Sequence, residues 1–136
     1  MYLLRVVARP MLGAIFVYSG LDSARKPHAK VPQAAPVIER LAERFDLPGD
    51  TATWVRVNGA VQVVAGVALS AGRVPRLAAL ALAGSLVPTT LAGHRFWEEA
   101  DDAGRARQRI QFLKNVSMLG GLLLAVDDLG KRPSRA

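Results

Sequence analysis

Two polar side chains, Lys114 and Asn115, stand in an otherwise apolar stretch near the end of the chain. Gln111 precedes them by three and four residues, so the three side chains share one face of a helix. An ionisable group in a lipid-spanning helix is costly and usually faces protein or water, which makes Lys114 a candidate functional residue. Such a group of side chains could bind the polar head of a membrane-soluble molecule.

Other candidate binding residues lie near the ends of three further apolar segments. They are Asp22, Arg56, Asn58, Gln62, Thr90 and His94. Asn58 and Gln62 are four residues apart and therefore share a helix face. No metal site is expected, because the only other histidine, His28, lies in a distant loop.

No catalytic residue is predicted from the motifs in the chain. The sequence has no cysteine, which excludes disulfides, thiol catalysis and cysteine-ligated clusters within it. It also has no nucleophile–base pair, phosphate-binding glycine loop or haem attachment motif. We interpret the acidic residues within 98–102 as a solvated loop rather than as catalytic carboxylates.

Four apolar segments, each long enough to cross a bilayer, must position the polar residues. They cover approximately residues 3–21, 54–72, 75–93 and 109–126. A soluble four-helix bundle is the alternative, but its helices should each show a polar face. The third segment has no charge from Leu77 to Gly93, which favours lipid. The predicted fold is all-α: an integral membrane four-transmembrane-helix bundle forming one domain over residues 1–136.

The long loop between the first two spans contains a short amphipathic helix, predicted over residues 36–46. Pro36 opens this helix, and Pro48 with Gly49 closes it. Its apolar side chains share one face: Val37, Ile38, Leu41 and Phe45. This pattern is typical of a helix that lies in the membrane interface.

The helix count predicts that the polar residues converge. Four antiparallel spans bring the end of the first, the start of the second, the end of the third and the start of the fourth to one side. Two interpretations remain open: Lys114 and Arg56 snorkel to the head groups while amides join the helices, or the cluster lines a ligand pocket. In both, Asp22 is the acid best placed to pair with Arg56 or Lys114.

The net charge of +7 is spread over loops. Because the chain has no compact basic patch, nucleic-acid binding is not predicted. We predict instead that the loops contact anionic membrane lipids. Cation density close to the span ends favours both termini on the cytoplasmic side.

Several strings of residues resemble the DoxX family of small four-helix bacterial membrane proteins. They are Arg9-Pro10, Tyr18-Ser19-Gly20, Asn58-Gly59 through Gly66, Val87-Pro88-Thr89-Thr90-Leu91-Ala92-Gly93-His94-Arg95-Phe96-Trp97, and Phe112-Leu113-Lys114-Asn115 with Gly120-Gly121. The resemblance covers nearly the whole chain and implies a compact, multi-pass domain in the bacterial plasma membrane, linked to redox physiology. The similar DoxD proteins are named as a subunit of an archaeal thiosulfate:quinone oxidoreductase. Actinobacterial DoxX proteins are linked to a membrane complex with a superoxide dismutase and a thiosulfate sulfurtransferase.

This resemblance implies an accessory or scaffold subunit of a membrane redox assembly, concerned with oxidative stress or respiration. Such a subunit would have protein partners, no redox centre of its own and no catalysis by itself. The alternative is a quinone- or lipid-binding protein, or an enzyme subunit of the thiosulfate:quinone oxidoreductase type, that uses the polar cluster. A homo-oligomer is compatible with both, and a small-solute transporter is a third hypothesis, although four helices are few for alternating access.

Overall fold

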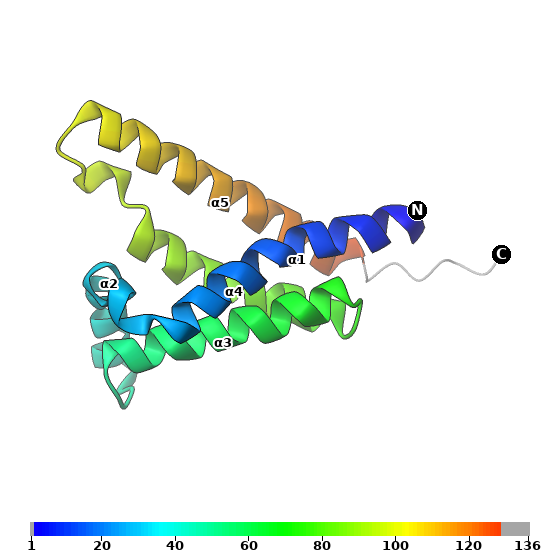
Figure 1. Cartoon of the computed structure of the whole chain (residues 1–136), viewed down its shortest axis with the longest axis horizontal. Coiled ribbons are helices and arrows are strands. Elements are labelled where there is room, and N and C mark those ends of the chain that lie inside the picture. The colour runs from blue at the N-terminus through cyan, green and yellow to red at the C-terminus, as the bar shows by residue number, and fades with distance from the viewer. Residues whose placement is uncertain (1, 129–136) are drawn as a thin grey trace.

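We describe residues 2–128 of the chain in a computed structural model (Figure 1). In this range every regular element is helical, and the elements follow in the order α1 (Tyr2–Arg25), η1 (Pro27–Lys30), α2 (Val31–Phe45), α3 (Thr51–Ser70), α4 (Pro75–Gly93), η2 (Phe96–Glu98) and α5 (Asp102–Asp128). Helices α1, α3, α4 and α5 are long and apolar enough to cross a membrane. The predicted all-α fold with four spans is confirmed.

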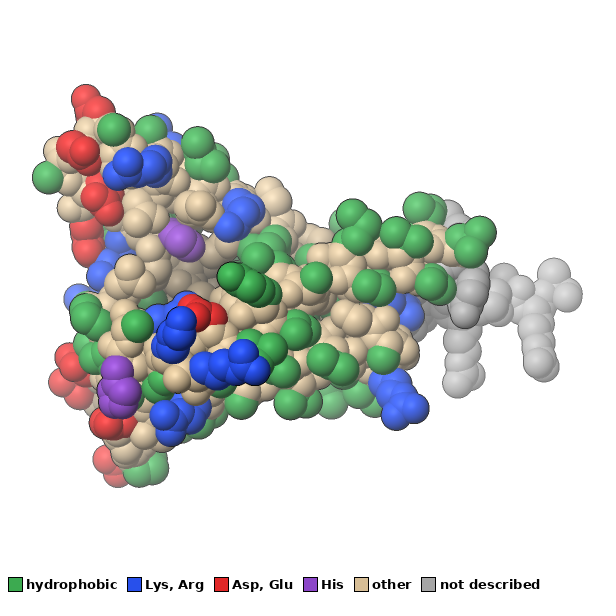
Figure 2. Space-filling model, viewed as in Figure 1, with side chains coloured by type: hydrophobic (Ala, Val, Ile, Leu, Met, Phe, Trp, Pro, Cys, Tyr) green, Lys and Arg blue, Asp and Glu red, His purple; other side chains and the backbone are tan. Residues whose placement is uncertain are grey.

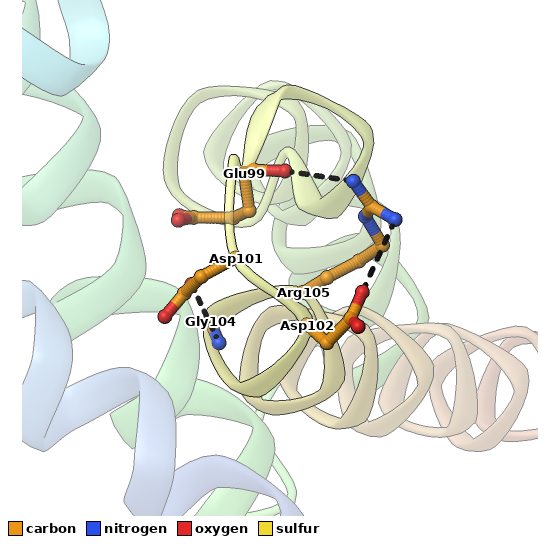
Figure 3. Close-up of polar contacts among 5 residues, drawn as sticks. All are labelled: Glu99, Asp101, Asp102, Gly104 and Arg105. Carbon is orange, nitrogen blue, oxygen red and sulfur yellow. Dashed lines mark hydrogen bonds and ion pairs between the residues drawn. The ribbon is translucent and has the colours of Figure 1, made fainter.

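Helix α5 begins at Asp102, seven residues before the predicted span, because the acidic loop starts the helix. The carboxylate of Asp101 accepts a hydrogen bond of 2.9 Å from the Gly104 backbone N–H, as an N-cap does (Figure 3). Arg105 donates to the Glu99 carbonyl at 3.1 Å and lies 3.6 Å from the Asp102 carboxylate. The carboxylates of Asp101 and Asp102 therefore have a structural role at the helix start.

The amphipathic helix is present, but its start was predicted wrongly. It begins at Val31, and Pro36 lies inside it. The 3₁₀ turn η1 leads directly into it, and Pro32 takes the first-turn position that suits proline. Helix α2 packs against α3 and α4, so it covers the loop end of the bundle.

Helices α1 and α3 pack backbone to backbone through two pairs of glycines. A Cβ atom at Gly20 would lie 2.5 Å from the Gly59 carbonyl oxygen, and one at Gly59 would lie 2.6 Å from the Gly20 carbonyl oxygen. A Cβ atom at Gly13 would lie 2.6 Å from the Gly66 carbonyl oxygen. Each helix repeats the contact after seven residues, which is two helical turns. No side chain larger than hydrogen fits at Gly20 or Gly59 without moving a backbone.

The buried core lies toward the end of the bundle where α1 begins and α5 ends. It is built around Phe16, Leu69, Leu82 and Leu122, which come from all four spans. Helix α5 packs mainly on α4, and near Gly121 it approaches Leu12 of α1. From there α5 diverges from α1 toward the loop end (Figure 1). The polar residues predicted to converge lie on that more open side of the molecule.

Candidate functional site

A polar network joins α3 to α4 at the middle of the bundle. The Gln62 amide donates to the Ser85 hydroxyl at 2.9 Å, and Ser85 donates to the Asn58 amide oxygen at 2.8 Å. The Asn58 amide nitrogen donates to the Thr89 hydroxyl at 3.1 Å. Each helix contributes residues four apart, which places them on one face. Asn58 and Gln62 therefore lie together, as their spacing predicted, and bond between helices.

Two further polar contacts tie α5 to α4. The buried Asn115 amide donates to the Thr90 hydroxyl at 3.0 Å. Closer to the loop, His94 Nδ1 lies 2.9 Å from the Gln108 amide oxygen. Because that oxygen only accepts, Nδ1 carries the hydrogen, which leaves Nε2 of a neutral imidazole as an acceptor.

Three of the predicted site residues do not join this cluster. Gln111, Lys114 and Arg56 are exposed on the outside of their helices. The Lys114 ammonium donates to the Gln111 amide oxygen, one turn nearer the loop. A lysine that reaches along its helix toward the interface in this way is snorkelling.

The predicted partner of Asp22 was wrong. Its carboxylate lies 2.9 Å from the Lys30 ammonium, and neither Arg56 nor Lys114 pairs with it. The turn η1 directly follows α1 and brings Lys30 back over the helix end. Lys30 thereby reaches Asp22 from the same loop, whereas the two predicted cations are exposed on α3 and α5.

A pocket of about 440 Å³ lies beneath α2 at the loop end of the bundle. The apolar residues of its lining are Ala34, Val37, Ile38, Leu41, Leu47, Val55, Pro88 and Ala92. Its hydrogen-bonding residues are Ser19, Ser23, Lys30, Gln33, Trp54, Asn58, Thr89, His94 and Gln108. Charged side chains gather at this end of the molecule, whose surface is hollowed between α5 and the other helices, whereas hydrophobic ones cover much of α1 and α3 (Figure 2).

Two serines of the lining, Ser19 and Ser23, were not among the predicted site residues. Hydroxyls in the spans commonly donate to the backbone carbonyl four residues earlier. Ser70, Thr89, Thr90 and Ser117 do so, at 2.7–3.0 Å. Neither Ser19 nor Ser23 has a side-chain hydrogen bond within the described residues, and both line the pocket. Their spacing of four residues near a helix end was the available signal.

The pocket is close to electrically neutral. Lys30 is its one charged lining residue in residues 2–128, and Asp22 neutralises it. No aspartate or glutamate lines it, and no group of three metal-binding side chains occurs in the part of the chain described. Its chemistry is that of uncharged hydrogen bonding beside apolar walls.

Four apolar helices with a helix-covered pocket at one end define a small multi-pass membrane protein. The family model DoxX matches residues 4–95, more than half of the chain. The chain therefore belongs to the DoxX family. The match spans α1 to α4 and ends before α5, so the string around Lys114 and Asn115 lies outside it. No match was found among the curated proteins or among the solved structures.

Proposed function

We propose that this DoxX protein binds the polar head of a quinone or a lipid in the pocket beneath α2. The observation that carries the proposal is the pocket itself, whose volume of about 440 Å³ falls in the usual range for small-molecule sites. Apolar walls with a few converging polar groups are also typical of such sites. Among the predicted residues, Asn58 and His94 would contact the ligand directly.

The arrangement suits an amphiphile better than a water-soluble solute. The apolar face of α2 lies against the pocket, so Val37, Ile38 and Leu41 offer contacts to a hydrocarbon tail. The surface is hollowed between α5 and the other helices at the same end of the molecule (Figure 2), and we propose that a tail leaves the pocket there. Asn115 and Gln62 do not line the pocket, but their hydrogen bonds to α4 hold α5 and α3 against the helix that forms one of its walls.

Fluorescence of Trp54 tests this proposal, because Trp54 lines the pocket. The chain has two tryptophans, so Trp97→Phe leaves Trp54 as the one reporter. We expect saturable quenching by a decyl-substituted benzoquinone in neutral detergent micelles. Ala92→Phe adds a ring to the pocket wall and should abolish the saturable component. Quenching that rises linearly, and equally in the filled variant, would contradict binding in this pocket.

A second function is favoured by α5, which has the smallest share of buried residues among the four spans. Its side chains Ile110, Leu113, Val116, Leu123 and Leu124 are exposed, and the helix packs mainly on α4. We propose that the protein is an accessory or scaffold subunit of a redox assembly in a bacterial plasma membrane. It would have no redox centre of its own, would not be catalytic by itself, and would present this helix to a protein partner or to a second copy.

Purification of the full chain from its native membranes in mild detergent tests the second function. We expect partner proteins to elute with it at constant ratio, and fewer of them after Leu113→Gln and Leu124→Gln. Consistent recovery of the chain alone would count against an assembly and would leave ligand binding untouched.

A further inference from the structure

We propose, resting on the binding function above, that the pocket selects an uncharged head group bearing carbonyl or hydroxyl oxygens. Ser19 and Ser23 are its hydrogen-bonding partners on α1. This choice narrows the ligands left open above, because a quinone or a neutral lipid alcohol has such a head and a phospholipid does not.

The charges around the pocket favour an uncharged head group. Lys30 is the lining cation, and the Asp22 carboxylate already holds it at 2.9 Å. The pair is partly exposed, so a phosphate entering the pocket would lose water and would have to compete with the Asp22 carboxylate for Lys30. An uncharged head loses much less hydration on entry.

The hydrogen bonds within the pocket lining leave the two serine hydroxyls available to a ligand. Several polar groups of the lining are already committed: the Trp54 ring N–H donates to the Pro48 carbonyl at 2.9 Å, and Asn58 bonds through both ends of its amide. The Ser19 and Ser23 hydroxyls have no partner among residues 2–128. A hydroxyl can donate to a carbonyl oxygen or accept from a hydroxyl hydrogen, so the pair fits either kind of head.

The packing of α1 on α3 holds the two serines in fixed positions. Ser19 and Ser23 are four residues apart and share one face of α1. Gly20 lies between them in sequence and presses against Gly59 of α3, where a Cβ atom on Gly59 would be 3.0 Å from Ser23 Cβ. This close contact fixes the height and rotation of α1 relative to α3. The two hydroxyls are therefore held in place before a ligand arrives, which lowers the entropy lost on binding.

Competition between matched amphiphiles tests the choice of head group. In the Trp97→Phe chain quenched by the decyl benzoquinone, a monoacylglycerol and a lysophosphatidate with the same acyl chain are added as competitors. We expect the neutral monoacylglycerol to restore Trp54 fluorescence at about tenfold lower concentration, because its uncharged head loses less hydration on entering the pocket. Equal or better competition by the lysophosphatidate would overturn the proposal.

Substitution of the serines tests their part. Ser19→Ala and Ser23→Ala should each weaken binding of the decyl benzoquinone about threefold to tenfold, as expected for one hydrogen bond. Ser117→Ala is the matched control, because its exposed hydroxyl bonds only to its own helix. Unchanged affinity in both serine variants, with saturable quenching intact, would overturn the hydroxyl assignment and leave the proposed binding function standing. Absence of saturable quenching in the parent chain would remove both.

Removing the negative charge of Asp22 tests separately whether the ion pair with Lys30 excludes anionic head groups. Asp22→Asn releases Lys30 from its ion pair beside the pocket. We expect the lysophosphatidate to compete several-fold better in this variant than in its parent, while the monoacylglycerol changes little. No gain for the anionic competitor would contradict the role assigned to the Asp22–Lys30 pair.

Discussion

Replacing Gly20 or Gly59 with alanine should separate α1 from α3 and destabilise the protein. The new Cβ atom at Gly20 would lie 2.5 Å from the Gly59 carbonyl oxygen, about 0.9 Å closer than the ordinary contact limit of 3.4 Å. The opposing atom belongs to a backbone and cannot rotate away. Overpacking of this kind costs about 1–3 kcal/mol.

The double variant has a distinctive expected result. Gly20→Ala and Gly59→Ala press on the same point from opposite helices, so one separation of the helices relieves both. Residues in contact are commonly non-additive. We therefore expect Gly20→Ala with Gly59→Ala to destabilise the protein by clearly less than the sum of the single variants.

Reversible unfolding in mixed micelles with increasing dodecyl sulfate, followed by circular dichroism, measures these free energies. Gly84→Ala is the matched control, because no atom lies within 4 Å of a Cβ placed there. Alanine is a better helix former than glycine, so the control should lose nothing and gain up to about 1 kcal/mol. Gly20→Ala as stable as the parent, or Gly84→Ala equally damaged, would refute the glycine-contact reasoning.

Three further predictions concern the ends of the spans. Asn115→Ala should destabilise the protein by about 0.6–1.7 kcal/mol, as loss of an interhelical hydrogen bond does, whereas Lys114→Met at an exposed position should change the unfolding free energy by less than about 0.5 kcal/mol. Hydrogen bonds from Thr53 lower the pKa of the Asp50 carboxyl below 3.8, so its stabilising effect should be full at neutral pH and be lost in acid as the pH falls through that lowered pKa. Asp50→Asn keeps an N-cap side chain but cannot titrate. The loss of unfolding free energy in acid should therefore be smaller in this variant. The same loss in variant and parent would exclude Asp50 as its source. Ala100 lies in the loop between α4 and α5, on the side of the membrane opposite the termini. Ala100→Cys should therefore react with a membrane-impermeant maleimide in intact cells if both termini are cytoplasmic. Labelling only after lysis would indicate the opposite orientation.

Hydropathy was enough to predict the four spans, because lipid requires about 20 apolar residues in each helix. It placed α4 at residues 75–93, where Pro75 starts the helix. It missed the start of α5, because a helix can continue beyond lipid through charged residues once a side chain such as Asp101 caps it. Hydropathy therefore reports the membrane-crossing part of a helix rather than the helix.

The polar cluster was predictable in outline and not in detail. Spacing placed Asn58 and Gln62 on one face, and the interhelical network uses both. The partner of Asp22 depended on the path of the η1 turn, which no residue pattern sets. Ser19 and Ser23 stand out only because they lack the usual bond to their own helix, and that property belongs to side-chain conformation.

The direct test of the central claim is to identify what the pocket holds in the native membrane. The full chain, purified in mild detergent, is analysed by native mass spectrometry beside the Ala92→Phe variant, and the bound molecules are extracted and identified. We predict one uncharged, membrane-soluble molecule with a carbonyl- or hydroxyl-bearing head on the parent chain, and none on the filled variant. An empty parent chain, or the same molecules retained by both, would contradict binding in this pocket.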